Sequence, residues 1–596
     1  MECKQLGPLF LGVTFFAATL YAAEPLPGTR PLDAPVDNVV AVQLKQVTDY
    51  FQGRIVAAQT IRDRAWKPDF SSDRAYQKSV RQQRDQLRTV LGLIDANGQP
   101  GTPRLERLSN TTTCRIERVT IPITAGLSAR GLLITPPSSG RQPAVIVCPD
   151  ADTWPEQFAG LTGEASAAGW LTMLIRGGVI VFIPQSIERL QDHPYCKQTG
   201  SKDRRWILYR LGYTVGRSMP GLDVQETLAA VEFLASRDDV DADRIVVTGV
   251  GQGGMTALMT GALEPRAAAV VVGDYFDNRD HCWDEPVDRR LRDQLLHFGD
   301  AELAALIAPR RLTIVASTGF VKSAHSVNSE IMRASRYFKG LRVDDCLVTL
   351  DGIAPSALTG ESVRAAADSI NAKAPLPTEF NLEVRVPAET AQTQRDRHFE
   401  ERLSYLRGLI GASEAKRYER WKIIDHPGAD FPATKERMLQ DYRALVGVVP
   451  SDGTPLNARS ELALTNEKYR AYRVTLDVVQ GVQVYGNLLV PRTIDGRRPA
   501  IICQHGLSGT PEMVTGLGMT KDTVYHEFGR KLAERGYVVF APLLLHHNPV
   551  KQINDQARQA NAVGMMRVAM PVAKTERVID FLETLPFVDA QRIGYY

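Results

Sequence analysis

The chain has 596 residues, of which 44% are hydrophobic and 23% are charged. This length exceeds what one hydrophobic core supports, so we expect several domain-sized units. The 71 basic and 68 acidic side chains nearly cancel and leave a formal net charge of +3. This balance, together with the lack of a basic run, argues against nucleic acid as a partner.

The N-terminus has the pattern of a secretory signal peptide. Lys4 supplies a positive charge, residues 6–20 are mostly apolar, and Ala22 and Ala23 offer small residues for cleavage. The apolar run is shorter than the roughly 20 residues that span a bilayer, so a retained anchor is the less favoured alternative. We therefore expect a signal peptide over residues 1–23, export to the periplasm or the exterior, and no membrane span after cleavage.

The cysteines do not form the pattern of a metal site or a disulfide framework. No CxxC occurs, and no metal or cofactor is expected. Cys148 and Cys503 lie in apolar runs, which is typical of buried thiols. A bridge between Cys196 and Cys282 stays open, because an oxidising compartment permits one.

An internal repeat organises the chain. GLLITP at 131–136 recurs as GNLLVP at 486–491, and VDADRI at 240–245 recurs as VDAQRI at 588–593. The repeated segments keep their order, which indicates a duplicated domain. We predict a first module over 38–373, a linker over 374–395 and a second module over 396–596.

Each module alternates short apolar runs with longer helical patterns. In the first module the apolar runs include AVIVCP (144–149), RIVVTGV (244–250) and AAVVVGD (268–274). Strands that alternate with helices predict βαβ units and a mostly parallel, doubly wound sheet. Uninterrupted Val and Ile runs favour strands that are covered on both faces. The predicted fold class is therefore α/β in both modules.

One junction in the first module has the pattern of a nucleophile elbow. RIVVTGV is followed by Gly251-Gln252-Gly253-Gly254 and then by a helical pattern, which is the strand–turn–helix setting of a G-x-S-x-G motif. With GLLITP (131–136), VIVFIP (179–184), DYFDNRDHCWDE (274–285) and LAALIAPRRL (303–312), the module resembles the α/β-hydrolase superfamily, in particular its acetyl xylan esterase-like and dienelactone hydrolase-like group. The resemblance implies a serine nucleophile, a histidine base, an acid and no metal.

The first module departs from that pattern at four places. Gly251 stands where the resemblance places serine, and glycine cannot attack an acyl carbon. No Asp occurs from 316 to 343, where the acid would follow its strand, and Glu330 falls inside a helical pattern. No histidine follows the last strand before His398. The oxyanion loop at 149–153 reads PDADT, whose carboxylates would repel an oxyanion. We expect the first module to be inactive.

The second module keeps its oxyanion loop. It reads His505-Gly506-Leu507-Ser508-Gly509, an HGxxG motif. By resemblance, the backbone N–H of Leu507, with that of Gly506, would bind the oxyanion; a tight turn closing a strand is the alternative. The position equivalent to Gly251 would be 599, beyond Tyr596. We therefore expect the second module to be truncated and the chain to be a fragment, with a genuine stop as the alternative.

The leading functional hypothesis is an exported carboxylic ester hydrolase of small-molecule or carbohydrate esters, whose activity belongs to the completed second module. The first alternative is a non-catalytic pseudo-hydrolase that binds carbohydrate or acts as a scaffold, for which the two modules would pair within the chain. The second alternative is a prolyl-oligopeptidase-like peptidase, although no propeller repeat precedes the modules. All three rest on fold analogy, which is a weak guide to substrate.

Overall fold

The structure is a computed structural model that describes residues 24–32, 38–94, 101–137, 140–163, 168–318, 324–372, 384–420, 431–544, 546 and 549–596. The predicted signal peptide, 1–23, lies outside these residues. The chain divides into two compact units. The large unit comprises Phe51–Gly447 and Asn554–Arg567, and the small unit comprises Met1–Tyr50, Val448–Ile553 and Val568–Tyr596.

The large unit contains a sheet that, in its described residues, has nine strands in the order β10-β9-β8-β7-β5-β6-β4-β3-β2. The strands from β10 to β6 pair in parallel, and β4, β3 and β2 add on antiparallel. Their bounds are β2 Arg104–Asn110, β3 Arg115–Thr124, β4 Leu127–Thr135, β5 Gln142–Cys148, β6 Ile180–Pro184, β7 Val240–Val250, β8 Ala267–Gly273, β9 Arg311–Ser317 and β10 Leu347–Ile353. The predicted α/β class with a mostly parallel sheet is confirmed.

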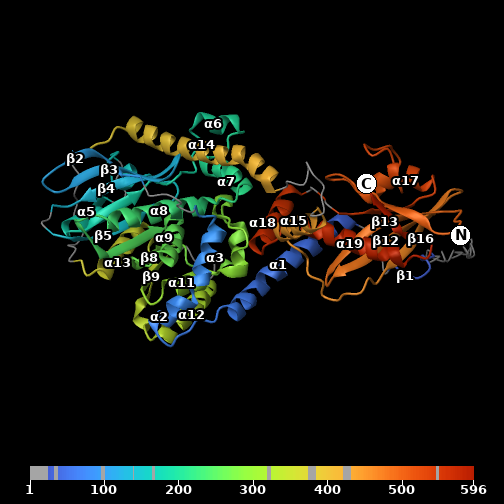
Figure 1. Ribbon diagram of the computed structural model, residues 1–596, viewed down its shortest axis with the longest axis horizontal. Helices are drawn as coiled ribbons and strands as arrows, with labels where there is room; N and C mark the ends of the chain where they lie inside the picture. The colour runs from blue at the N-terminus through green and yellow to red at the C-terminus, as the bar shows by residue number, and fades with distance from the viewer. Residues whose placement is uncertain are drawn as a thin grey trace, which may run out of the picture. The chain divides into compact units, whose positions relative to one another are not determined.

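Helices cover both faces of this sheet (Figure 1). Helices α8, α9 and α11 pack on one face with Val247 of β7, and α5 and α13 pack on the other with Val246. Both valines are fully buried, which explains the uninterrupted apolar runs of the central strands. The helices of the described chain are α1 Val39–Ala65, α2 Asp73–Ser79, α3 Arg81–Leu91, α4 Pro155–Phe158, α5 Ala168–Arg176, α6 Pro194–Gln198, α7 Arg204–Thr214, α8 Met219–Ala235, α9 Gln252–Leu263, α10 Gln294–His297, α11 Asp300–Ile307, α12 Ala324–Leu341, α13 Leu358–Ser369, α14 Ala388–Arg420, α15 Phe431–Val446, α16 Pro511–Thr515, α17 Phe528–Ala533, α18 Val550–Ala562 and α19 Ala569–Thr584.

The small unit contains a sheet with the order β1-β11-β12-β13-β15-β14-β16. Its strands are β1 Arg30–Pro31, β11 Arg459–Thr465, β12 Tyr469–Val479, β13 Val482–Pro491, β14 Arg498–Ile502, β15 Val538–Pro542 and β16 Val588–Tyr595. From β11 to β16 the order matches that of β2 to β7.

Equivalent residues of the two sheets also pair in the same register. Gly131 lies opposite Pro184 between β4 and β6, and Gly486 lies opposite Pro542 between β13 and β15. Ala144 pairs with Ile245 between β5 and β7, and Ala500 pairs with Ile593 between β14 and β16. Gly131 with Gly486, and Ile245 with Ile593, are pairs that the sequence repeat aligns.

Helix α14 begins inside the segment that the sequence predicts as a linker. Residues 388–395 of that segment are helical, and residues 373–383 lie outside the described chain. The buried residues Phe399, Leu403 and Leu406 of α14 pack with Leu127 and Leu208 of the large unit. The compact units therefore divide at Gly447, whereas the module boundary at 396 remains a sequence prediction.

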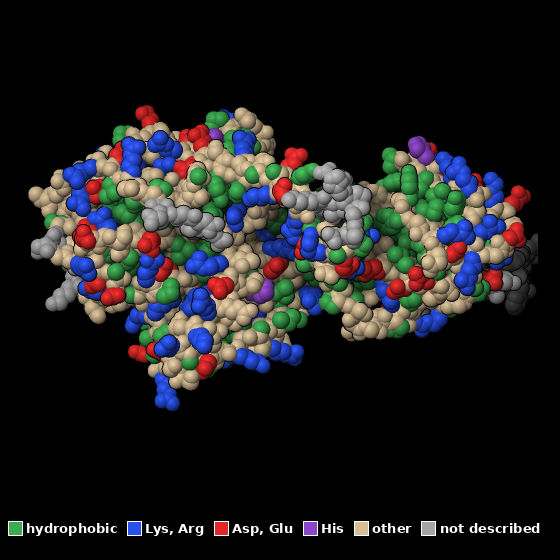
Figure 2. All heavy atoms as spheres, in the orientation of Figure 1, with side chains coloured by type: hydrophobic (Ala, Val, Ile, Leu, Met, Phe, Trp, Pro, Cys, Tyr) green, Lys and Arg blue, Asp and Glu red, His purple; other side chains and the backbone are tan. Residues whose placement is uncertain are grey.

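The thiols of Cys196 and Cys282 are free, so the bridge that the sequence left open is not formed. Cys196 belongs to the cluster under α7 and α14, while Cys282 packs against a separate cluster that contains Leu295. On the face seen in Figure 2, acidic and basic side chains are interspersed, as the near-zero net charge suggests. Among the helices of the described chain, none has the length and apolar composition that crossing a bilayer requires.

Candidate functional site

The turn between β7 and α9 has the backbone geometry expected of an elbow. Gly251 has φ 57° and ψ −116° and directly precedes α9, a conformation that strains residues with a side chain. A Cβ on Gly253 would lie 2.0 Å from the carbonyl oxygen of Cys148, so the helix begins against β5. The glycine run thus permits a tight strand-to-helix turn whose central residue carries no reactive group.

The carboxylate of Asp150 fills the space beside Gly251. A Cβ on Gly251 would lie 2.7 Å from Asp150 Oδ1. That oxygen accepts hydrogen bonds from the backbone N–H groups of Ala151 and Gln252, both at 2.8 Å. In the elbow geometry these two N–H groups, one following the nucleophile and one from the loop after a central strand, would form the oxyanion hole. Both N–H groups that would bind a substrate oxyanion therefore already donate to the carboxylate of Asp150.

An acid does lie near the elbow, outside the span 316–343 in which the sequence places the acid of the triad. Asp274 directly follows β8 and has φ 43°. Its carboxylate accepts hydrogen bonds from Ser317 at the end of β9, at 2.7 Å from N and 2.6 Å from Oγ. The sequence prediction placed the acid after β9, whereas the GD pair that ends AAVVVGD indicates an acid after β8. In the described structure, the carboxylate of Asp274 bonds to Ser317 and its backbone N–H donates to the carbonyl of Val315, and neither partner is a histidine.

The other candidate acid and base lie elsewhere in the large unit. Glu330, on α12, accepts hydrogen bonds from Ala301 N and from Arg333. Strand β10 runs through Gly352 into a 3-10 turn, Pro355–Ala357, and then α13, without a histidine. The next histidine, His398, lies on α14. Within the described residues, the structure thus brings no serine, imidazole and carboxylate together at Gly251.

Paired charges surround the first residue of α9. The side-chain oxygen of Gln252 accepts a hydrogen bond from Arg289 Nε at 2.8 Å. Arg205 is fully buried and pairs with Asp223 at 2.8 Å and Asp288 at 2.5 Å. These ion pairs compensate each other's desolvation, so their role in the described structure is to hold the loops together.

Helix α14 inserts a second set of charges above α8. Arg402 and His398, one turn apart, are 1% and 0% exposed. Arg402 forms an ion pair with Glu226 of α8 and donates a hydrogen bond to the carbonyl of His398 at 3.0 Å. Burial, and the nearby charges of Arg130 and Arg204, lower the pKa of His398 well below its ordinary value.

We expect the buried His398 to make the large unit acid-sensitive. The unfolded imidazole binds a proton near pH 6.5 and the folded one does not, so stability is present above pH 6.5 and lost as the pH falls below it. The expected loss is about 1.4 kcal/mol per pH unit, measured as the urea midpoint between pH 7.5 and 5.5. Tryptophan fluorescence reports the large unit, because all six tryptophans fall within residues 66–421.

The variant His398→Gln should flatten this pH dependence between pH 6.5 and 5.5. The exposed His281→Gln in the same unit is the matched control and should leave the dependence unchanged. An equal slope in the wild type and the His398→Gln variant would show that another group carries the acid sensitivity.

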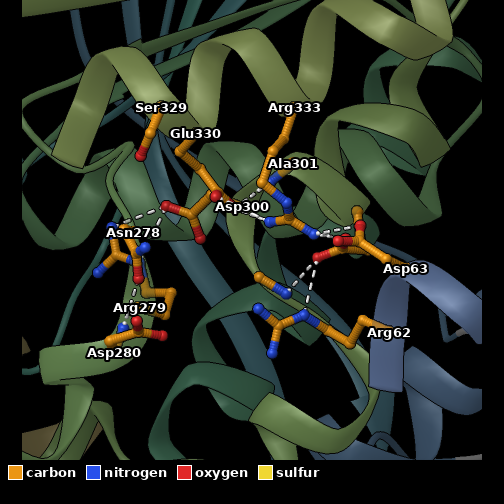
Figure 3. Close-up of polar contacts among 12 residues, drawn as sticks. Arg62, Asp63, Asn278, Arg279, Asp280, Asp300, Ala301, Ser329, Glu330 and Arg333 are labelled. Atoms are coloured by element: carbon orange, nitrogen blue, oxygen red, sulfur yellow. Dashed lines mark hydrogen bonds and ion pairs between the residues drawn. The ribbon is translucent and has the colours of Figure 1, made fainter. Parts of the chain in front are cut away.

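The acid-rich segment 274–285 is part of a buried ion-pair network (Figure 3). Arg279 pairs with Asp300 at 2.7 Å and with Glu285 at 2.5 Å. Next to it, Glu302 pairs with Arg62 at 3.1 Å and with Arg333. In the part of the chain that the structure describes, no cluster of three or more His, Cys, Asp or Glu side chains is arranged to hold a metal. The ion pairs of this segment therefore join it to the interior of the large unit.

The predicted oxyanion loop of the second module forms a tight turn after β14. His505 is buried, and its Nε2 accepts a hydrogen bond from Leu544 N at 3.1 Å, while Nδ1 lies 2.7 Å from the carbonyl of Gly506. Burial lowers the pKa of His505, which suits this neutral accepting role.

Of the two donors that the sequence proposes, one is already engaged. Gly506 N donates to the hydroxyl of Tyr525 at 2.8 Å. A Cβ on Gly509 would lie 2.4 Å from the same hydroxyl. Leu507, 67% exposed, aligns with Ala151 of the first module, so its N–H remains the better candidate of the pair.

Comparison with known proteins gives a family match in the same region. The model of the acetyl xylan esterase (AXE1) family matches residues 223–276. The Bacillus subtilis protein "Putative hydrolase YtaP" is 29% identical over 140 residues, which cover 22% of this chain and 46% of that protein. The 4-O-methyl-glucuronoyl methylesterase 1 of Phanerochaete chrysosporium is 30% identical over 130 residues, 20% of this chain and 27% of the relative. The chain thus spans less than half the length of either curated relative.

Among solved structures, the methylesterase BT1017 is similar over 62% of this chain and 81% of its own, with 17% identity and a TM-score of 0.42. The strand order and the strand–turn–helix junction define the large unit as an α/β-hydrolase fold. Over residues 223–276, the family match makes the chain similar to the acetyl xylan esterases.

Proposed function

We propose that this chain is an exported protein of the carboxylic ester hydrolase lineage whose first module does not catalyse. The observation that carries the proposal is the carboxylate of Asp150, which accepts hydrogen bonds from both N–H groups that would form the oxyanion hole. This carboxylate lies next to Gly251, which has no side chain. An oxyanion that develops on a substrate would have to displace a fixed negative charge. Serine chemistry also requires a hydroxyl that this turn does not supply.

We assign any ester hydrolysis to the second module. Its supports are the HGxxG loop at 505–509 and the repeated strand order and registers, which favour a tandem duplication. The family match and the names of the relatives favour an acetylated or glucuronoyl carbohydrate ester as substrate, and the predicted signal peptide favours an exported enzyme.

The alternative is a non-catalytic protein in which the first module binds carbohydrate or serves as a scaffold. The occupied oxyanion donors and the buried ion pairs around Gln252 favour this role for the first module. Both proposals share an inactive first module and differ in what the second module does.

The test uses the whole chain. Turnover of 4-nitrophenyl acetate is measured, and the protein is treated with a fluorophosphonate probe and mapped by mass spectrometry. We expect no labelled serine within residues 38–373. Any turnover should be lost on substitution of His505 and kept on substitution of Asp150. A labelled serine in the first module, or turnover that requires Asp150, would overturn its assignment as inactive.

A further inference from the structure

A cavity of about 150 Å³ lies below the Asp150 loop of the large unit, on the α13 side of the sheet. Its walls come from the ends of β5 and β7, from α4 and from α13. The volume is about five times the share of one water molecule in the liquid, and it is below the usual range of drug-sized sites. A ligand of one small ring would fit.

Two buried hydroxyl groups line this cavity without a hydrogen-bond partner. Thr248, on β7, is 0% exposed, and Ser362, on α13, is 1% exposed. The Oγ1 of Thr248 and the Oγ of Ser362 both lack a partner in the described structure. Buried polar groups are normally satisfied, and each one left unpaired costs about 1–3 kcal/mol. Two such groups from different elements that line one cavity indicate that something polar fills it.

The rest of the wall defines the chemistry of the occupant. Thr153 and Thr359 add two hydroxyls, while Phe158 and Val363 supply apolar surface. Asp150 lines the cavity as well, and its Oδ1 is already held by two N–H groups. Burial raises the pKa of the Cys148 thiol to about 12, which keeps that wall residue neutral. Among the residues that the structure describes, no Lys, Arg or His lines the cavity.

We propose that the first module binds a small neutral polyol, such as a free pentose, in this cavity without transforming it. Hydroxyls of the ligand pair with Thr248 and Ser362 and donate to Asp150, and its C–H face packs on Phe158. Because the described residues of the wall include no cationic side chain, carboxylates and phosphates are disfavoured as ligands. This inference rests on the proposed function only in taking the first module to be non-catalytic.

The test is isothermal titration of the whole chain with D-xylose, with tetrahydropyran as the same ring without hydroxyls. We expect saturable heat with D-xylose and none with tetrahydropyran. Thr248→Val and Ser362→Ala should each weaken binding at least 10-fold. Thr260→Val is the matched control, because Thr260 is also 0% exposed with an unpartnered hydroxyl but does not line the cavity. That variant should bind D-xylose like the wild type.

Several outcomes would overturn the proposal. No saturable heat with D-xylose would mean that the cavity holds water only, and heat with methylammonium instead would make the site a cation site. Equal weakening by Thr248→Val and Thr260→Val would show that the loss is not specific to the cavity. The fluorophosphonate label is measured on the same samples. If D-xylose does not bind and no serine of the first module is labelled, only the polyol site is wrong. If a serine of the first module is labelled, the proposed function is wrong.

Discussion

We expect Gly251→Ala to lower the free energy of unfolding of the large unit by about 2–6 kcal/mol. Backbone strain at φ 57° contributes about 1–3 kcal/mol of this cost. The contact of the new methyl group with the Asp150 carboxylate, 2.7 Å from Oδ1, adds overpacking of about 1–3 kcal/mol. The measurement is urea unfolding followed by tryptophan fluorescence, which reports the large unit.

Two glycines of the same unit separate these contributions. Gly126 has φ 77° with nothing within 4 Å of a Cβ, so Gly126→Ala should cost only the backbone strain, about 1–2 kcal/mol. Gly408, inside α14, has open space and an ordinary φ, and Gly408→Ala should stabilise by about 0.5–1 kcal/mol.

The contact with Asp150 is tested by a double-mutant cycle. In the Asp150→Gly background, Gly251→Ala should cost only the backbone strain of about 1–3 kcal/mol, because the carboxylate that the methyl group would meet is gone. Additive costs of the two substitutions would show that Asp150 does not occupy the space beside Gly251.

We expect Glu302→Ala to destabilise the large unit by about 3–5 kcal/mol, because it leaves buried charges without their partner. Glu302 is 0% exposed. Its carboxylate pairs with Arg62 at 3.1 Å and with Arg333, and it accepts a hydrogen bond from Gly299 N at 2.7 Å. Both arginines are largely buried and extend into the network of Figure 3. Glu302→Gln keeps the shape and should have an intermediate effect.

A surface pair provides the control for this loss. Glu232 is 56% exposed in its pair with Arg266, and exposed pairs contribute about 0–1 kcal/mol. Glu232→Ala should therefore change the urea midpoint little. If Glu302→Ala cost no more than Glu232→Ala, the buried network would not be a major source of stability.

The fold class followed from the periodicity of the sequence. The runs at 144–149 and 244–250 form adjacent parallel strands, and the glycine run at 251–254 forms the turn into α9. These features depend on residues close in sequence, where apolar runs and glycines specify local structure directly. The prediction that Gly251 lies at an elbow used the same local information.

The surroundings of that turn could not be predicted in the same way. Asp150 follows β5 and Gly251 follows β7. The two residues come into contact because these strands are neighbours in the sheet, and strand order cannot be read from local sequence. The acid at Asp274 was missed because its partner, Ser317, is the last residue of another strand, β9. Helix α14 was assigned to the second module because its Arg, Glu and Leu pattern does not indicate which surface it packs against.

By itself, the sequence determined that the chain is an α/β protein with a repeated pattern of strands, and that the elbow of the first module has no nucleophile. Only the tertiary structure decided that Asp150 takes both oxyanion donors and that Thr248 and Ser362 share a cavity. The physical reason is range. Side-chain type and periodicity act over a few neighbouring residues, whereas hydrogen bonds and cavities join groups that only the packing of strands and helices brings together.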